Sequence, residues 1–395
     1  MASETTAIQQ QVVRGVRAGF VSLTLLSFGH FFIDLYSMAL GTLQPLIVSK
    51  LQLSLTQAGI LGGLLLCSSS VLQPVYGYLS DRFHTRMFTV LAPAVAGIFM
   101  SSIGAAPTFG WLLALVALGG AGIASFHPQA SARATLGLDT NRQRWFAVFI
   151  SAGTLGMALG PTVFSTALPL IGLDRSYWFA IPGVLATVML LLLMPELEAD
   201  SPHRRNRFNL APLKAVWKPL TILYFLVFIR SIVQVTYAQF LALYLTHERG
   251  YSFAQASWGL SIYLTAGALG GFVGGHLADR FGGRRVILIS MMGCVPFLAT
   301  FFLATGALSL AGLALGGLFL LFTIPVNVVM AQDLVPSQAG TISALMMGFA
   351  WGMSGLLFIP LTGWAADHYS LHTTLMALTI FPIVGFFLTL KLPKR

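Results

Sequence analysis

The sequence predicts an all-α integral membrane protein with twelve transmembrane helices in two six-helix bundles and both termini in the cytoplasm. Three observations predict this fold class. The composition is unusually apolar, twelve apolar stretches are long enough to cross a bilayer, and one loop motif occurs twice, 198 positions apart.

The composition places most of the protein surface in lipid. Of 395 residues, 56% are hydrophobic and 9% are charged, and the mean hydropathy is +0.82, whereas a soluble domain carries about 25% charged residues. The net charge of +10 does not indicate nucleic-acid binding, because the basic residues lie in short loops between apolar stretches. Cys67 and Cys294 lie inside apolar stretches, which indicates neither a disulfide nor a metal site.

A transmembrane helix needs about 20 predominantly apolar residues. The chain offers twelve such stretches, the first too long for the apolar part of a cleavable signal peptide. The predicted spans are Phe20–Leu46, Gln57–Leu79, Met87–Ala106, Trp111–Ala130, Trp145–Leu168, Tyr177–Met194, Leu220–Leu245, Ala254–Ala278, Val286–Ala304, Leu308–Ala331, Gly340–Ala365 and Thr373–Leu392.

The distribution of Lys and Arg predicts the orientation. Of 22 such residues, 18 lie in the terminal tails and the loops on their side, and three (Lys50, Arg175 and Arg249) lie in the opposite loops. The positive-inside rule then places both termini in the cytoplasm. One long polar segment separates six spans from six. The predicted organisation is therefore a cytoplasmic tail (1–19), a first bundle (20–194), a cytoplasmic linker (195–218) and a second bundle (219–395).

The two halves carry the same loop after their second spans. Gly77–Arg86 reads GYLSDRFHTR and Gly275–Arg285 reads GHLADRFGGRR. Two copies at corresponding positions indicate a duplication, and transporters built in this way place their site between the repeats near the membrane midplane.

The repeated loops resemble the loop motif of the major facilitator superfamily, and the resemblance covers essentially the whole chain. In that family the loop charges form a latch that helps to hold one conformation of the two bundles. The residues to which the resemblance assigns this role are Asp81, Arg82, Arg86, Asp279, Arg280 and Arg284.

Further segments resemble particular exporters of that superfamily. Gly156, Gly160 and Pro161 in the fifth span are similar to the glycine–proline motif of its exporters, and a small-xxx-small pair also allows close packing in any membrane helix. Four further features resemble the fosmidomycin-resistance group of drug exporters. They are the segments Ser125–Gln129, Ala331–Pro336 and Gly348–Met353 and the pair His30 and Asp34. That group typically has Glu at the position of Gln129, so a coupling carboxylate must lie elsewhere in this chain, or coupling is altered.

Two charged residues lie deep in the predicted spans, Asp34 in the first and Arg230 in the seventh. A charge at the bilayer centre costs at least about 2.5–3.5 kcal/mol, so each requires a reason. One interpretation is a buried ion pair between Asp34 and Arg230 that joins the bundles, and the other is a role in transport. An ion pair that is broken when Asp34 is protonated would combine the two roles.

The neighbours of these charges predict a cavity face. His30 and Asp34 are one helical turn apart, as are Arg230 and Gln234. We expect Asp34 and His30 to carry protons, although an interior histidine with purely structural hydrogen bonds is the alternative for His30. The expected substrate-binding residues are Arg230, Gln234, Tyr237, Gln129 and Asn327. Arg133 and Asp333 either close a gate at the cytoplasmic end or are interfacial charges.

No nucleotide loop, metal cluster or nucleophile–base pair occurs in the sequence, so we expect neither an enzyme nor a bound cofactor. The predicted function is proton-coupled export of a small, anionic drug or metabolite by alternating access, with the proton gradient as the energy source. Alternatives are a facilitator or importer of a polar metabolite, or a receptor that does not transport. The expected setting is a bacterial inner membrane, with a monomer that contacts lipid, protons and substrate but no nucleic acid.

Overall fold

The fold consists of helices long enough to span a bilayer. The computed structural model describes residues 2–83, 85–138, 142–195 and 210–393, with the backbone alone at 2–15, 81, 142–143, 210–211 and 339–340. Within these ranges, twelve helical stretches are long and apolar enough to cross a membrane, so the predicted twelve spans are confirmed. Residues 196–209 of the predicted linker lie outside the described ranges.

Several spans are built from two helices in succession. The first six spans comprise α1 (Ala2–Ser37), α2 (Ala39–Leu51), α3 (Leu55–Leu66), α4 (Gln73–Phe83), α5 (Met87–Ser101), α6 (Phe109–Arg133), α7 (Arg142–Ile171) and α8 (Ala180–Leu193). After α9 (Leu210–Ala215), the last six comprise α10 (Trp217–His247), α11 (Phe253–Phe281), α12 (Gly283–Leu303), α13 (Gly306–Leu321), α14 (Thr323–Leu334), α15 (Ala339–Ser343), α16 (Trp351–His368), α17 (Leu371–Ala377) and α18 (Ile380–Thr389).

Two spans change their winding midway. The second span passes from α3 to α4 through the π-helical segment Cys67–Val71, and the eleventh passes from α15 to α16 through the π-helical segment Ala344–Ala350. Each π-helical turn accommodates an extra residue and interrupts the regular hydrogen-bond ladder. The two segments touch each other, and Gly352, two residues after the second segment, packs on Val71.

The duplication extends to the helix starts. Ser54 and Gln57 form a capping box at the start of α3, and Ser252 and Gln255 form the same box at the start of α11. These pairs are 198 positions apart, the spacing of the repeated loops. A capping box satisfies two backbone N–H groups that have no partner inside the helix, so both halves use the same signal to begin the corresponding span.

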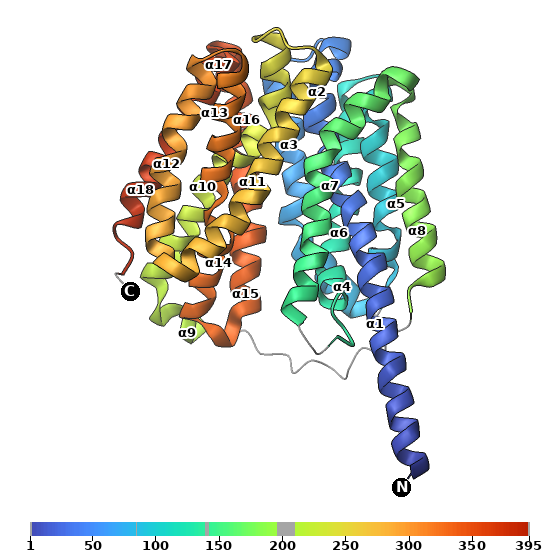
Figure 1. The fold of residues 1–395 in the computed structure, drawn as a ribbon. Coiled ribbons are helices and arrows are strands. Elements are labelled where there is room, and N and C mark those ends of the chain that lie inside the picture. Colours follow the sequence, from blue (N-terminus) through green and yellow to red (C-terminus); the bar gives the residue numbers. More distant parts are fainter. Residues whose placement is uncertain (1, 84, 139–141, 196–209, 394–395) are drawn as a thin grey trace.

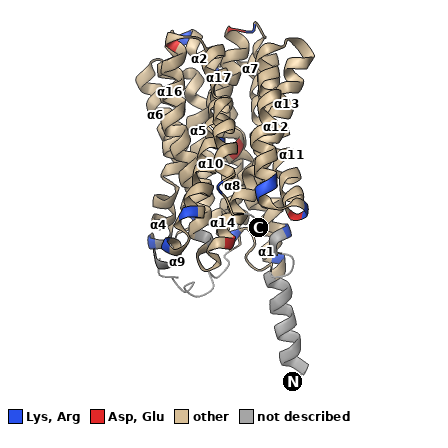
Figure 2. Ribbon diagram, turned by 90° about the vertical axis from the view of Figure 1, so that its left-hand side faces the viewer, with Lys and Arg blue, Asp and Glu red and all other residues tan. Residues whose placement is uncertain are grey.

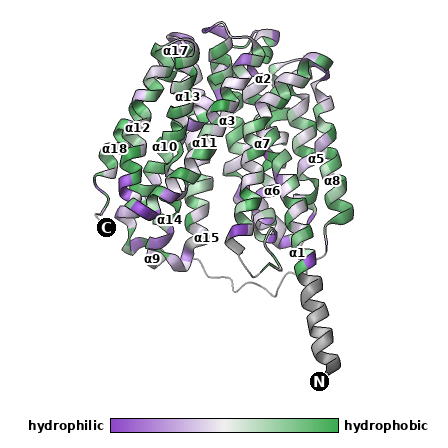
Figure 3. Cartoon of the chain, in the orientation of Figure 1, coloured by the Kyte–Doolittle hydropathy of each residue, from purple (hydrophilic) through white to green (hydrophobic). Residues whose placement is uncertain are grey.

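Both chain termini lie at one end of the bundle, here called the termini face (Figure 1). Lys and Arg gather toward this end, and a smaller charged group lies at the other end, the opposite face (Figure 2). The spans between the two faces are mostly apolar (Figure 3). Large apolar side chains point outward along them, including Leu170, Leu192 and Leu303, as a lipid-facing surface requires. The cytoplasmic location of the termini stays a prediction.

The two bundles meet closely at the opposite face. There α3 packs on α16, α2 on α10, and α7 on α11. Glycine allows the first two contacts, because a side chain at Gly59 would lie 2.7 Å from the carbonyl oxygen of Ile359, and one at Gly41 would lie 2.6 Å from that of Ala238. In the third contact, the hydroxyls of Thr162 and Ser261 are 2.8 Å apart.

A carboxylate of the second bundle reinforces this closure. Asp367, near the end of α16, accepts hydrogen bonds from the backbone N–H groups of Leu55 and Thr56, both at 2.8 Å, and from the Thr56 hydroxyl. An anion is favourable at a helix N-terminus because unpaired N–H groups and the helix dipole point at it. Asp367 therefore caps α3 across the bundle boundary.

We expect Asp367→Asn to shift the protein toward conformations open at the opposite face, because the variant removes the charge and one acceptor oxygen. For an exposed group this is worth ~0.5–1 kcal/mol, a two- to fivefold change in the closed-to-open ratio. Distances between spin labels on either side of the boundary measure the shift. Glu248→Gln is the matched control, since Glu248 accepts from the N–H groups of Leu371 and His372 at 2.7 and 2.8 Å within one bundle. An equal shift in both variants would contradict the assignment.

Candidate functional site

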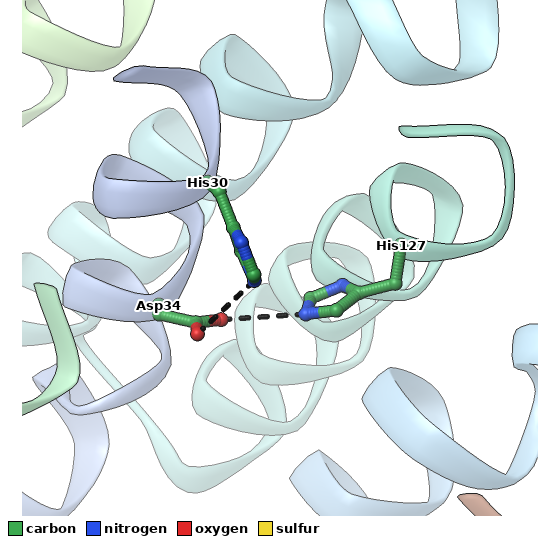
Figure 4. Close-up of side chains that lie close together, drawn as sticks. All are labelled: His30, Asp34 and His127. Carbon is green, nitrogen blue, oxygen red and sulfur yellow. Dashed lines mark ion pairs between the residues drawn. The ribbon is translucent and has the colours of Figure 1, made fainter. Parts of the chain in front are cut away.

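Three side chains converge on one point inside the first bundle (Figure 4). His30 and Asp34 come from α1, and His127 comes from α6. His30 Nε2 is 3.4 Å from Asp34 Oδ2, and His127 Nε2 is 3.4 Å from Asp34 Oδ1. Asp34 and His30 are 8% and 4% exposed, while the His127 side chain is 26% exposed. The cluster is thus enclosed on the α1 side and more open at His127.

Backbone carbonyls fix which nitrogen of each ring carries hydrogen. His30 Nδ1 lies 2.9 Å from the carbonyl oxygen of Phe149 in α7, and His127 Nδ1 lies 2.9 Å from that of Ile123. A carbonyl oxygen only accepts, so both Nδ1 atoms must donate. Each neutral ring therefore presents the lone pair of Nε2 to the Asp34 carboxylate.

This arrangement requires a positive charge. Two lone pairs and an anionic carboxylate repel one another unless a cation, or a proton on Nε2 or on the carboxylate, lies between them. The three lone-pair atoms, Nε2 of each histidine and an oxygen of Asp34, lie within 4.8 Å of one another. This spacing leaves room for a bound proton or a metal ion. No other group of three or more His, Cys, Asp or Glu comes this close among the side chains that the structure describes.

The sequence prediction named Asp34 and His30 as proton carriers and gave His127 no role of its own. The predicted fourth span ended at Ala130, whereas α6 continues to Arg133, so His127 lies inside the helix and not at its last turn. The available signal was an ionisable residue followed by Pro128 inside an apolar stretch.

Arg230 is the buried cation of the second bundle. It is 3% exposed, donates to Gln234 Oε1, and lies 5.8 Å from the ring of Trp351 in α16. Its Nε has no hydrogen-bond partner. The alternative of an ion pair with Asp34 is wrong for this conformation, because Asp34 contacts the two histidines. Within the described part of the chain, no carboxylate lies within 4.0 Å of the guanidinium.

The other predicted substrate-binding residues have different surroundings. Asn327 is fully buried, and neither atom of its side-chain amide has a partner. Tyr237 donates its hydroxyl to the carbonyl oxygen of Leu375, inside the second bundle. Gln129 donates to the carbonyl of Thr85 and accepts from the Thr89 hydroxyl. Both ends of Gln129 are thus used to fasten α6 to the start of α5 in this conformation.

The repeated loops act within each bundle in this conformation. Arg86 donates to the carbonyl of Met194 at 2.9 Å, at the end of α8, and Arg284 donates to that of Leu390 at 3.0 Å, after α18. The two arginines, 198 positions apart, thus satisfy carbonyls at the end of the last span of each half. The Asp81 side chain lies outside the described part of the structure.

Two further latch residues make local contacts in this conformation. Arg82 donates to Tyr78, one turn earlier on α4, and Arg280 lies over the ring of its neighbour Phe281. No ion pair of Asp279, Arg133 or Asp333 occurs among the described side chains. A closed Arg133–Asp333 gate is therefore not formed in this state.

The glycine–proline motif lies where α7 crosses α1. A side chain at Gly156 would collide with the carbonyl of Phe31, and one at Gly160 would lie 3.0 Å from that of Leu35. Pro161 follows inside α7, one residue before the contact of Thr162 with the second bundle.

Comparison with known proteins places the chain in a family. The family model described as Major Facilitator Superfamily matches residues 26–243 and 223–395. The fosmidomycin resistance protein of Escherichia coli (strain K12) is 29% identical, over 96% of this chain and 94% of its own. An uncharacterized MFS-type transporter of Bacillus subtilis (strain 168), YfnC, is 31% identical, over 92% and 90%.

Solved structures agree in fold. A bacterial homologue of the human lysosomal transporter Spinster, in an inward-facing and occupied conformation, superposes with a TM-score of 0.80 at 15% identity, over 93% of this chain and 95% of its own. Fold and relatives are those of transporters, not enzymes. The chain therefore belongs to the major facilitator superfamily and is a multi-pass membrane transporter of a small substrate.

Proposed function

We propose that this transporter exports a small anionic solute in exchange for protons, by alternating access in a bacterial inner membrane, as a monomer without a bound cofactor. The cluster of His30, Asp34 and His127 carries the proposal, because its two lone pairs and carboxylate require a cation. A membrane gradient can supply this cation as a proton, and histidine and carboxylate are side chains that exchange protons near neutral pH.

The unpaired charge of Arg230 supports an anionic substrate. A buried guanidinium without a carboxylate is unfavourable, and a phosphonate, phosphate or carboxylate fits its planar fork with two hydrogen bonds. The fully buried amide of Asn327 in the same bundle, also without a partner, is a second polar group that offers a donor and an acceptor. The similarity to a fosmidomycin resistance protein favours export of a drug or a related metabolite.

The conformation corresponds to one step of the proposed cycle. The bundles touch at the opposite face, and with the termini in the cytoplasm this state is open inward. An exporter loads substrate in this state while the proton leaves the cluster to the cytoplasm. The proton site lies in the first bundle and Arg230 in the second, so each bundle contributes one of the two exchanged charges.

Transport in proteoliposomes tests the proposal. Thermal shift first selects a substrate from phosphonates including fosmidomycin, phosphates, carboxylates and lipophilic cations. Proteoliposomes with a lumen more acidic than the outside should then accumulate the labelled compound, because outward proton flow drives inward substrate flow in either orientation of an antiporter. EDTA is present throughout, so that metal ions do not occupy the cluster.

Each competing function has its own outcome in this assay. A proton symporter would expel the compound from acidic vesicles, a facilitator would equilibrate it regardless of the pH difference, and a receptor would bind it without flux. Any of these results would reject proton-coupled export. A preference for lipophilic cations would reject the anionic substrate.

A further inference from the structure

Gly153 of α7 packs directly against the His30–Asp34–His127 cluster, whose side chains come from α1 and α6. It is buried, and a side chain placed on it would collide with His30 Nε2 and lie 2.5 Å from Asp34 Oδ2. The hydrogen of the Gly153 α-carbon therefore faces the gap between the two groups that exchange the proton. Every other amino acid would fill this gap.

The same helix also sets the orientation of His30. Phe149 lies one turn before Gly153 on α7, so both residues face α1. The Phe149 carbonyl accepts from His30 Nδ1, and the Phe149 ring stacks on the imidazole with centroids 4.4 Å apart. The close approach of α7 to α1 therefore determines which His30 nitrogen faces Asp34.

The titratable groups facing Asp34 come from α1 and α6 alone. They are His30 and His127. Of the other helices packed on α1, α5 and α8 carry no titratable side chain, and α7 carries Arg142 and Arg144 in its first turn. The helix α2 carries Lys50 in its last turn, where it pairs with Asp174. A change at Gly153 thus alters the space of the cluster without removing a charge from it.

We propose that Gly153 is a positioning residue for proton coupling, because the absence of its side chain holds the cluster in the geometry that binds and releases a proton. The inference rests on the proposed proton coupling. This role differs from helix packing in what it predicts. If Gly153 served packing alone, a substitution there would leave the pH dependence of transport unchanged.

The experiment compares Gly153→Ala with Gly160→Ala in proteoliposomes. Both glycines face α1, but a side chain at Gly160 would meet the carbonyl of Leu35 and the side chain of Met38, away from the cluster. We expect Gly153→Ala to lower accumulation driven by the pH difference by at least about tenfold while substrate binding at fixed pH is retained. Gly160→Ala should keep the wild-type pH profile, at a lower rate if packing suffers.

The outcomes separate this inference from the proposed function. Wild-type protein without pH-driven accumulation would reject the proposed function. Wild-type protein that accumulates substrate, with an unchanged pH profile in Gly153→Ala, would overturn the role of Gly153.

Two further measurements test the inference even if Gly153→Ala does not fold in the wild-type background. His30→Ala removes the imidazole, one of the two groups with which the new methyl group collides, so Gly153→Ala should destabilise this variant less than the wild type. Equal destabilisation in both backgrounds would assign the glycine to packing alone. In addition, ¹⁵N-histidine spectra of the full-length protein should show a protonated Nδ1 for His30, and a hydrogen on Nε2 alone would overturn the geometry.

Discussion

Asp34→Asn is expected to abolish accumulation driven by a pH gradient and to leave substrate exchange intact. The amide keeps the size of the carboxylate but exchanges no proton. Its NH2 group can also donate to the Nε2 lone pair of one of the two histidines, and the amide carries no negative charge, so the groups of the cluster repel one another less in the absence of a bound cation. Driven accumulation should fall to the level of protein-free liposomes, while counterflow of labelled against unlabelled substrate continues.

Asp174→Asn is the control for this result. Asp174 is an exposed carboxylate that pairs with Lys50 at 2.5 Å, away from the cluster, and exposed pairs contribute little to stability. Its variant should transport like the wild type. If Asp34→Asn still concentrates substrate along a pH gradient, Asp34 is not the coupling group.

Arg230→Ala should lose substrate binding. Truncating one partner of a buried charge pair costs ~2–5 kcal/mol, which is roughly a 30- to 4,000-fold loss of affinity. Without ligand, the melting temperature should hold or rise, because the variant removes a buried and unpaired cation. Thermal shift with and without substrate measures both effects, and Arg230→Lys should retain part of the ligand-induced shift because it keeps the charge.

Arg249→Ala is the matched control, because Arg249 is a second arginine of this bundle that stacks on an aromatic ring. Arg249 lies 5.9 Å from the Tyr244 ring, and it donates to the carbonyl of Phe302 and to the Ser309 hydroxyl at 3.1 and 3.0 Å. Its loss should lower the melting temperature and spare affinity. Unchanged affinity in Arg230→Ala would make Arg230 a structural residue.

The sequence predicted the fold because each span is a local property of composition and length. The twelve apolar stretches, the repeated loops and the pair Arg230 and Gln234 are all readable within one helix or one loop. Partners on different helices are not readable in this way. Asp34 contacts His127 of α6 instead of Arg230, because the packing of α1 against α6 decides which side chains meet.

Contacts between side chains and backbone carbonyl groups of other helices also could not be predicted from the sequence. Nothing in the residue types at Phe149 and Ile123 indicates that their carbonyl oxygens orient two histidines. Likewise, a glutamine at position 129 suggested a substrate contact, and only its hydrogen bonds to Thr85 and Thr89 reveal a fastening role.

The paired π-helical segments, Cys67–Val71 and Ala344–Ala350, give the second and eleventh spans a hinge at the same depth. On one side of the hinge, α3 and α16 are held together by the glycine contacts and by Asp367. On the other side, α4 and α15 can bend, because a π-helical turn is already a break in the hydrogen-bond ladder. We therefore expect the termini face to narrow around a bound substrate while the contacts at the opposite face are still closed.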